Sequence, residues 1–213
     1  MKVTAVNIGV PKIVSWRGKE IKTGIYKYPV ENAIYLEEKD VAGDAVIDRK
    51  YHGGIEKACY VYSADHYAFW KELYPDLTWN YGMFGENITV EGLKEANLCI
   101  GDQYQLGTSK VQITQPREPC YKLGIRFETQ KILKQFLAKT YCGSYVKIIE
   151  KGSVTKGDTM TLIKKGSSLS IEKLYQLFFN PKTSSEEIES ALDNKFLTNN
   201  NREFLEKRLK ILS

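Results

Sequence analysis

The distribution of glycine divides this 213-residue chain into two parts of different character. All 16 glycines lie between Gly9 and Gly166, and none follows Gly166. Glycine marks turns and loops, so the first part is expected to be rich in turns, and the second to consist of uninterrupted helices. We therefore predict one domain over residues 1–165 and an appendage over residues 166–213.

Short β-rich runs recur through the first part. Gly-Asp pairs at 43–44, 101–102 and 157–158 mark turns between several of them. Many short strands with such turns are typical of a β-barrel, and regular βαβ units fit poorly because long helical stretches are few. We expect a mainly β fold whose strands are Val3–Ile8, Ala45–Ile47, Ala58–Tyr62, Asn87–Val90, Tyr104–Leu106, Val111–Thr114, Tyr145–Ile149 and Thr159–Ile163.

Two helices are expected within the first part. Ser63 is a favourable N-cap for a helix that runs to Leu73 and stops near Pro75. A second helix is expected over Phe127–Lys139, where apolar residues recur on one helical face.

Beyond the boundary, the spacing of apolar residues predicts three short amphipathic helices. Ser170 can cap the first, and Ser184 with Glu187 forms a capping-box pattern for the second. Asn200 or Asn201 can cap the third. Such a unit has a small core and is marginal alone, so we expect it to dock on the barrel.

The charge balance places any anionic ligand in the first part. The net charge is +5, and residues 166–213 hold equal numbers of basic and acidic side chains. This excess is too weak to predict nucleic-acid binding. No apolar run is long enough for a transmembrane helix, and the N-terminus has no signal-peptide pattern, so we expect a cytoplasmic protein without a membrane partner.

Several common kinds of site have no support in the sequence. The four cysteines form no CxxC pair and the chain has 2 histidines, which argues against structural zinc and a disulfide framework. The chain also lacks GxGxxG, Walker A, GxSxG and HExxH motifs.

The most informative motif surrounds Cys120. Pro116 and Pro119 stiffen a loop after a predicted strand, and they bracket Arg117, while Lys122 follows the cysteine. Cations near a thiol favour the thiolate, which is the form that acts as a nucleophile and a metal ligand. With no histidine nearby in sequence, this loop suits a soft transition metal. A buried, inert cysteine stays an alternative.

A second motif runs from Asp48 to Gly54. Two glycines follow His52 and permit close backbone approach, and the preceding Lys50 belongs to a basic pair that could bind phosphate. A structural hydrogen-bonding role for His52 stays open. His66 lies among aromatic residues in a predicted helix and is expected to be structural.

Two further motifs could belong to a site but could equally have a purely structural role. Glu86 and Asn87 end a glycine-rich turn at the start of a strand, where a self-capping turn would also explain them. Lys27 precedes a Tyr-Pro pair and could reach an anion or lie on a solvated strand face.

In their order along the chain, these motifs resemble the MOSC family, the molybdenum cofactor sulfurase C-terminal domain family, and within it the YiiM-like bacterial branch. The resemblance covers nearly the whole chain, including a three-helix appendage. Its most specific part is the Pro-Arg-x-Pro-Cys-x-Lys-Leu pattern, and Tyr121 stands where many relatives carry Trp. The segments that carry it are Lys22–Ile25, Lys27–Val30, His52–Gly54, His66–Tyr67, Trp70, Phe84–Asn87, Ile100–Asp102 and Gln115–Leu123.

The resemblance implies a MOSC-type β-barrel that binds molybdenum cofactor, the molybdopterin form, with Cys120 as a direct molybdenum ligand. It further implies an oxidoreductase that detoxifies N-hydroxylated compounds such as hydroxylamino bases and amidoximes. Arg117, Lys27 and Lys50 would contact the pterin phosphate or pyran-side oxygens. Thr23 would also belong to the cofactor site, and Asn87 and Gln115 would hydrogen-bond the pterin edge. His52 would orient a neighbouring group or donate a proton. Glu86 would take one of those two roles or brace its turn.

Two questions stay open at this point. The alternative function is a non-catalytic carrier that uses Cys120 to hold sulfur or to deliver molybdenum cofactor. As an enzyme, the chain would need electrons from a separate flavin or iron–sulfur reductase, because it has no motif for either group. Docking to that reductase, formation of a homodimer and stabilisation of the core are all compatible with the helical tail.

Overall fold

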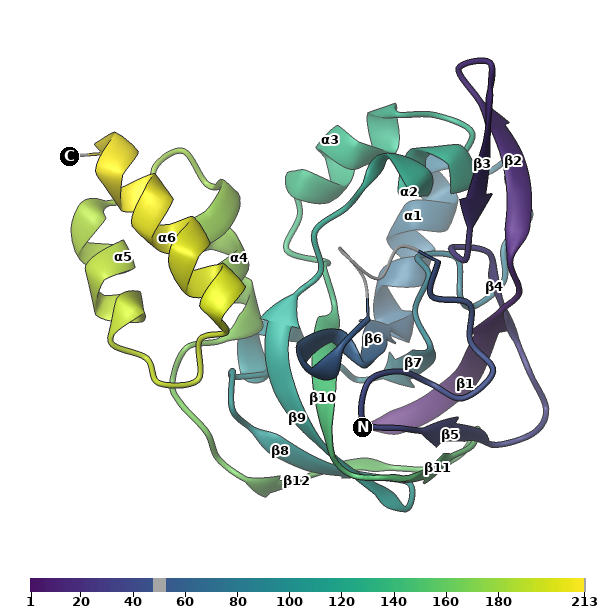
Figure 1. Cartoon of the computed structure of the whole chain (residues 1–213), viewed down its shortest axis with the longest axis horizontal. Coiled ribbons are helices and arrows are strands. Elements are labelled where there is room, and N and C mark those ends of the chain that lie inside the picture. The colour runs from purple at the N-terminus through teal and green to yellow at the C-terminus, as the bar shows by residue number, and fades with distance from the viewer. Residues whose placement is uncertain (48–52, 213) are drawn as a thin grey trace.

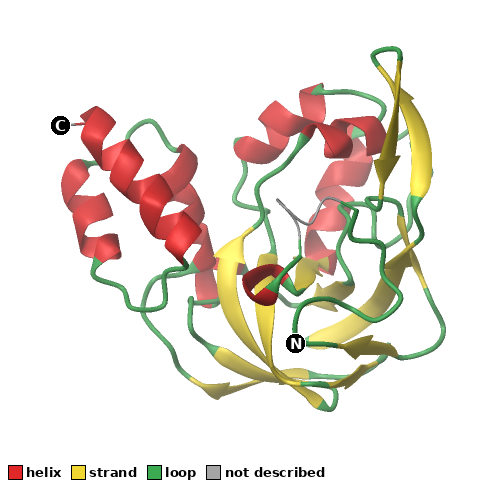
Figure 2. Cartoon of the chain, in the orientation of Figure 1, coloured by secondary structure: helices red, strands yellow, loops and turns green. Residues whose placement is uncertain are grey.

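The computed structural model describes residues 1–47 and 53–212. Strands form the body of the molecule, and the helices gather in two groups, α1–α3 above the sheet and α4–α6 at one side (Figures 1 and 2). Within the described ranges, no helix is both long enough and apolar enough to cross a membrane.

A mixed sheet of 8 strands builds the body, in the order β12-β8-β9-β10-β6-β7-β1-β4. Neighbouring strands are antiparallel except β6 and β7, which run parallel. The strands are β1 (Lys2–Gly9), β4 (Lys27–Pro29), β6 (Cys59–Ser63), β7 (Ile88–Glu91), β8 (Gln103–Leu106), β9 (Ser109–Pro116), β10 (Ser144–Glu150) and β12 (Met160–Lys164).

Backbone hydrogen bonds close this sheet into a barrel. The Val3 N–H donates to the Asp158 carbonyl at 2.8 Å, and the Gly157 N–H donates back to the Val3 carbonyl at 2.9 Å. The Met160 N–H donates to the Met1 carbonyl at 2.9 Å. The start of β1 is thereby tied to the start of β12. Closure satisfies strand edges that would otherwise be open, and it confirms the predicted mainly β, barrel-type fold.

Two small sheets complete the β structure and were not expected from the sequence. A hairpin joins β2 (Lys12–Trp16) to β3 (Lys19–Thr23), and β5 (Ile34–Leu36) pairs with β11 (Gly152–Val154). Arg17 and Gly18 both have positive φ, as a two-residue hairpin turn of type I′ requires. The predicted strand at Ala45–Ile47 is wrong, because this segment is irregular in the structure.

The helices of the first part are shorter than predicted. A 3₁₀ turn (Ala64–His66) precedes α1 (Tyr67–Leu73). Ser63 does not cap it, because its hydroxyl donates instead to the Leu93 carbonyl at 2.9 Å. The expected helix over 127–139 is limited to α3 (Lys131–Leu137). A further helix, α2 (Tyr121–Arg126), begins directly after Cys120 and was not predicted.

The tail contains the three predicted helices, α4 (Ile171–Phe179), α5 (Ser185–Leu192) and α6 (Asn199–Leu212). Ser170 caps α4 by accepting from the Lys173 N–H at 3.1 Å, and Ser184 forms the predicted capping box with Glu187. The predicted cap of the third helix, Asn200 or Asn201, is wrong. Thr198, and not an asparagine, precedes α6 and accepts from the Asn201 N–H at 3.3 Å.

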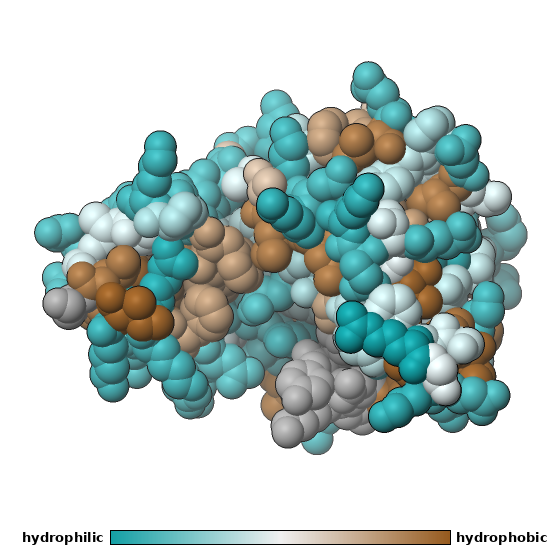
Figure 3. All heavy atoms as spheres, turned by 90° about the horizontal axis from the view of Figure 1, so that it is seen from above, coloured by the Kyte–Doolittle hydropathy of each residue, from teal (hydrophilic) through white to brown (hydrophobic). Residues whose placement is uncertain are grey.

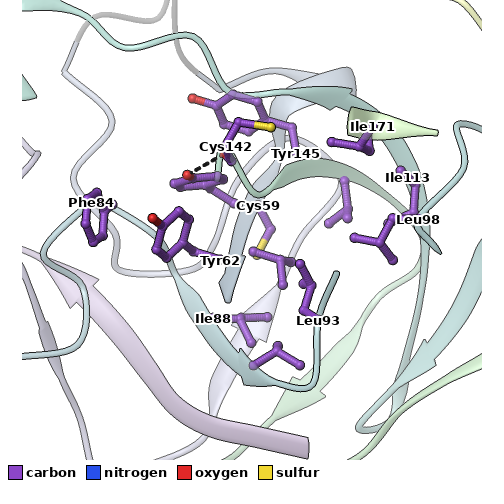
Figure 4. Packing of buried hydrophobic residues seen from close by; sticks show 14 of the residues in the cluster. Cys59, Tyr62, Phe84, Ile88, Leu93, Leu98, Ile113, Cys142, Tyr145 and Ile171 are labelled. Carbon is purple, nitrogen blue, oxygen red and sulfur yellow. Dashed lines mark hydrogen bonds between the residues drawn. The ribbon is translucent and has the colours of Figure 1, made fainter. Parts of the chain in front are cut away.

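The tail packs directly on the barrel. Ile171 of α4 belongs to the same buried cluster as Leu98 and Ile113 (Figure 4). Two backbone hydrogen bonds join the parts, from the Ile100 N–H to the Leu169 carbonyl at 2.9 Å and from the Ile171 N–H to the Leu98 carbonyl at 2.7 Å. These contacts supply the apolar partner that three short helices lack alone.

Candidate functional site

A cavity of about 90 Å³ forms where distant segments of the chain meet. The end of β3, the irregular stretch after Gly43, the start of β6 and the loop after β9 all contribute to its wall. Of the residues predicted for the site, Thr23, Lys27, Asn87, Arg117 and Cys120 line this cavity. The structure therefore brings together side chains that are far apart in sequence.

Cys120 lies at the junction of two cavities. It precedes the first residue of α2 and lines both the smaller cavity and an adjoining one of about 580 Å³. Cys59 and Cys142 are buried in the core (Figure 4), and burial raises the pKa of both thiols, so they stay protonated. Cys120, in contrast, is partly exposed and reaches both cavities.

Lys27 is buried and ion-paired with Asp44, a residue that the sequence analysis missed. Burial lowers the pKa of Lys27, and the carboxylate beside it opposes that shift. The same carboxylate accepts from the Gly9 N–H at 2.8 Å and from Asn87 Nδ2 at 2.9 Å. Lys27 and Asn87 thus form part of a hydrogen-bonded wall. The Gly43-Asp44 pair predicts a turn. No neighbouring residue in the sequence indicates that the Asp44 carboxylate pairs with a lysine.

Arg117 crosses from the loop after β9 to the turn before β7. One Nη donates to the Phe84 carbonyl, and the guanidinium lies 4.9 Å from the centre of the Tyr60 ring. Its Nε is buried and has no hydrogen-bond partner among the described residues. Buried donors are normally paired, so a ligand acceptor is a candidate partner for this one.

Two further cations, Lys57 and Lys122, line both cavities beside Cys120. Lys122 was expected only as a neighbour of the thiol, and Lys57 was not singled out. Burial lowers the pKa of Lys57. With Lys27 and Arg117 they place four basic side chains against one carboxylate, that of Asp44, among the described residues that line the smaller cavity. This surplus favours an anionic ligand, in the part of the chain where the charge balance predicted one.

Glu86 and Gln115 do not line the smaller cavity. Glu86 is fully buried and accepts from the Gly82 N–H at 2.8 Å, the Phe84 N–H at 3.1 Å and the Thr89 hydroxyl at 2.9 Å. These contacts make it a brace for the turn, one of the roles considered for it. Gln115 lines the larger cavity.

Of the two histidines, His66 lies within the described residues. His52 and Lys50 lie outside the described residues, so their predicted roles stay predictions. His66 has the structural role expected for it. Its Nε2 lies 2.9 Å from the nearer carboxylate oxygen of Glu95, and its ring stacks on Tyr141 with centroids 3.9 Å apart.

The larger cavity separates the Cys120 loop from the helical tail. Its wall includes Tyr121 and Tyr145 from the barrel part and Asn201 and Phe204 from α6. Seen from above, the surface is hollowed between the tail and the rest of the molecule (Figure 3). The Thr198 hydroxyl donates to Gln115 Oε1 across this boundary at 3.3 Å.

Fold and site together define a class of protein. It is a closed β-barrel with a helical appendage, in which one thiol stands in a cation-lined cavity. The family model of the MOSC domain matches residues 48–161, which is more than half of the chain. The chain belongs to the MOSC domain family, as the motifs predicted.

Curated relatives agree with this assignment. The chain is 35% identical over 212 residues to the uncharacterized protein YflK of Bacillus subtilis (strain 168), covering 99% of this chain and 96% of that one. It is 29% identical over 153 residues to protein YiiM of Escherichia coli (strain K12), covering 71% and 68%. A protein of Gibberella moniliformis named "Reductase" is 34% identical over 152 residues, which is 70% of this chain and 27% of that protein.

Solved structures show the same fold. YiiM from Geobacillus stearothermophilus superposes with a TM-score of 0.81 at 28% identity, covering 98% of each chain. YiiM from Escherichia coli superposes with a TM-score of 0.77 at 22% identity, covering 99% of this chain and 94% of that one. The similarity extends through the tail, so the appendage is part of the shared architecture.

Proposed function

We propose that this protein is a molybdenum-cofactor-binding oxidoreductase that reduces N-hydroxylated compounds with electrons from a separate reductase. The observation that carries the proposal is the position of Cys120, which lines both a small cavity with basic side chains and a larger cavity whose wall includes aromatic and amide side chains. A relative named "Reductase" supports the redox part of the proposal.

The residues of the smaller cavity fit the cofactor. A thiolate is a suitable ligand for a soft transition metal, and basic side chains suit the phosphate of a pterin. Cys120 would ligate the metal, and Lys57, Lys122 and Arg117 would hold the anionic end. The Nε of Arg117, buried without a partner among the described residues, is a donor available to that end.

When bound, the cofactor supplies the two electrons that cleave the N–O bond, and two protons complete the products, an amine and water. The protein supplies binding, orientation and exclusion of water. Lys27 is ion-paired with Asp44. We therefore propose that it stabilises the cavity wall and contributes positive electrostatic potential, and that it does not contact the phosphate directly. His52 stays the proposed proton donor, and Lys50 and Thr23 stay proposed cofactor contacts.

Turnover of a hydroxylamino base tests this function. Protein from a host that makes molybdenum cofactor would be given hydroxylaminopurine and a chemical reductant under anaerobic conditions, with Cys120→Ser as the test variant. Cys99→Ser is the matched control, because Cys99 is also partly exposed but lies beside Asp102 near α4. We expect turnover by wild type and by Cys99→Ser and none by Cys120→Ser.

The carrier alternative predicts a different result. A carrier would exchange sulfur or cofactor with a second protein and would not turn over the base. Cofactor-loaded wild-type protein without turnover, whatever the reductant, would reject the enzyme and favour the carrier.

A further inference from the structure

We infer that the larger cavity holds the ring of a planar nitrogen heterocycle and that α6 of the helical tail supplies one of its walls. This inference rests on the proposed function, because it locates the substrate beside the proposed metal ligand. It assigns Asn201 and Phe204 to substrate recognition and gives the appendage a role in the reaction.

The two cavities divide the site by chemistry. Both are lined by Lys57, Cys120, Lys122 and Tyr145, so they meet at the thiol. The smaller one adds two further cations, Lys27 and Arg117, whereas the larger one adds two aromatic rings, three amides and the Glu118 carboxylate. A volume of about 580 Å³ lies within the range of small-molecule sites. A ligand in the larger cavity would therefore lie next to a metal held by Cys120.

Aromatic side chains of the larger cavity present surface that a flat ring would cover. Phe204 and Tyr121 are 38% and 39% exposed, although both line the cavity. Phe204 is held in place by Phe178, with ring centroids 4.9 Å apart. An exposed but positioned aromatic ring is what recognition of a base by stacking requires.

Asn201 contributes a polar side chain to the wall of the larger cavity. It lines the same cavity and is 4% exposed, yet its Nδ2 has no hydrogen-bond partner among the described residues. Buried amide donors are normally paired, so an unpaired one points to a missing acceptor. A ring nitrogen or carbonyl of a heterocycle is an acceptor of the right kind.

The position of Asn201 is fixed by the start of α6. Its backbone N–H donates to the Thr198 hydroxyl, and that hydroxyl donates to Gln115 Oε1 on β9. The chain of hydrogen bonds sets the amide against the loop that carries Cys120. Thr198 is a positioning residue in this arrangement.

Binding of adenine to the metal-free protein tests the site without turnover. Calorimetry would compare wild type with Asn201→Ala, Phe204→Ala and Phe204→Leu, the last of which keeps an apolar contact with Phe178. Glu206→Ala is the matched control, because Glu206 is an exposed residue of the same helix. We expect each cavity variant to bind adenine about tenfold more weakly, and the control to stay within about twofold.

The loaded enzyme provides the second measurement. The KM for hydroxylaminopurine is expected to rise about tenfold in Asn201→Ala and Phe204→Ala, while kcat/KM for acetamidoxime, which has no ring, changes less than about twofold. An equal fall in kcat/KM for both substrates in the α6 variants would overturn the inference. Failure of wild type to bind adenine at millimolar concentration would also overturn it.

The outcomes separate this inference from the proposed function. Turnover of both substrates with no effect of the α6 variants on KM would leave the reductase standing and reject the base site. Asn201-dependent binding of adenine by a protein that reduces neither substrate would establish the base site and reject the reductase.

Discussion

Lys27 and Asp44 form an ion pair inside the wall of the small cavity, with side chains only 8% and 2% exposed. The carboxylate also accepts from Gly9 and Asn87, so one acidic residue ties three segments of the chain together. A buried pair of this kind contributes little net stability, but removal of one partner leaves an uncompensated charge.

Asp44→Asn is therefore expected to lower the free energy of unfolding by about 3–5 kcal/mol, because it leaves Lys27 charged and buried. Urea unfolding monitored by circular dichroism measures the change. Glu150→Gln is the control, since it breaks the exposed Lys110–Glu150 pair (2.6 Å) and should cost less than about 1 kcal/mol. Equal costs for the two variants would refute the buried pair.

The stability of the turn before β7 is expected to depend on pH through Glu86. Burial raises the pKa of this carboxyl above its usual value of 4.5. The folded state then binds a proton more tightly than the unfolded state, so the stabilising contribution is complete below pH 4.5 and is lost as pH rises through the folded-state pKa.

Glu86→Gln removes that dependence. Unfolding free energies measured for both proteins from pH 4 to pH 8, a window of about four units, should show wild type losing stability relative to the variant as pH rises. A wild type that gains stability relative to the variant over this range would mean that the folded-state pKa is lowered.

The two N-caps of the tail offer a matched comparison. Thr198→Ala and Ser184→Ala should each lower the free energy of unfolding by about 1 kcal/mol, because each removes an acceptor for a helix N–H. Only Thr198 also contacts Gln115 in the larger cavity, so only its variant should raise the KM for a base substrate. If both variants raised KM equally, the effect would come from the lower stability of the tail and not from the contact between Thr198 and Gln115.

Cofactor retention is expected to depend on the cations beside Cys120. Lys57→Gln and Lys122→Gln should each weaken retention about tenfold, since a charge-assisted hydrogen bond to a phosphate contributes about 1.5–3 kcal/mol. Pterin fluorescence after acid denaturation measures the content of the purified proteins. Lys110→Gln, in the exposed pair on β9, is the control and should retain wild-type content.

Local signals in the sequence predicted the parts of the fold that local interactions determine. Ser170 and Ser184 were correct as caps, because a cap depends on residues within one turn. The third cap was misplaced, because Thr198 lies just before three asparagines, a residue type that caps helices at least as well as threonine. Ala45–Ile47 looked like a strand by composition but is irregular where it borders the cavity.

Long-range relationships could not be predicted in this way. The bonds from Val3 to residues 157 and 158 that close the barrel join opposite ends of the body. Asp44 and Lys57 enter the cavity only through the fold, and neither lies in a motif that marks it. Cys120 and Arg117 were found because two prolines set a distinctive local pattern around them.

The central claim is that Cys120 holds molybdenum, and metal content tests it most directly. Wild type, Cys120→Ser and Cys99→Ser would be produced with molybdate in a host that makes the cofactor, purified anaerobically and measured by elemental analysis. We expect close to one molybdenum per chain in wild type and in Cys99→Ser, and almost none in Cys120→Ser. Folded wild-type protein without molybdenum, or a Cys120→Ser protein that keeps its full content, would contradict it.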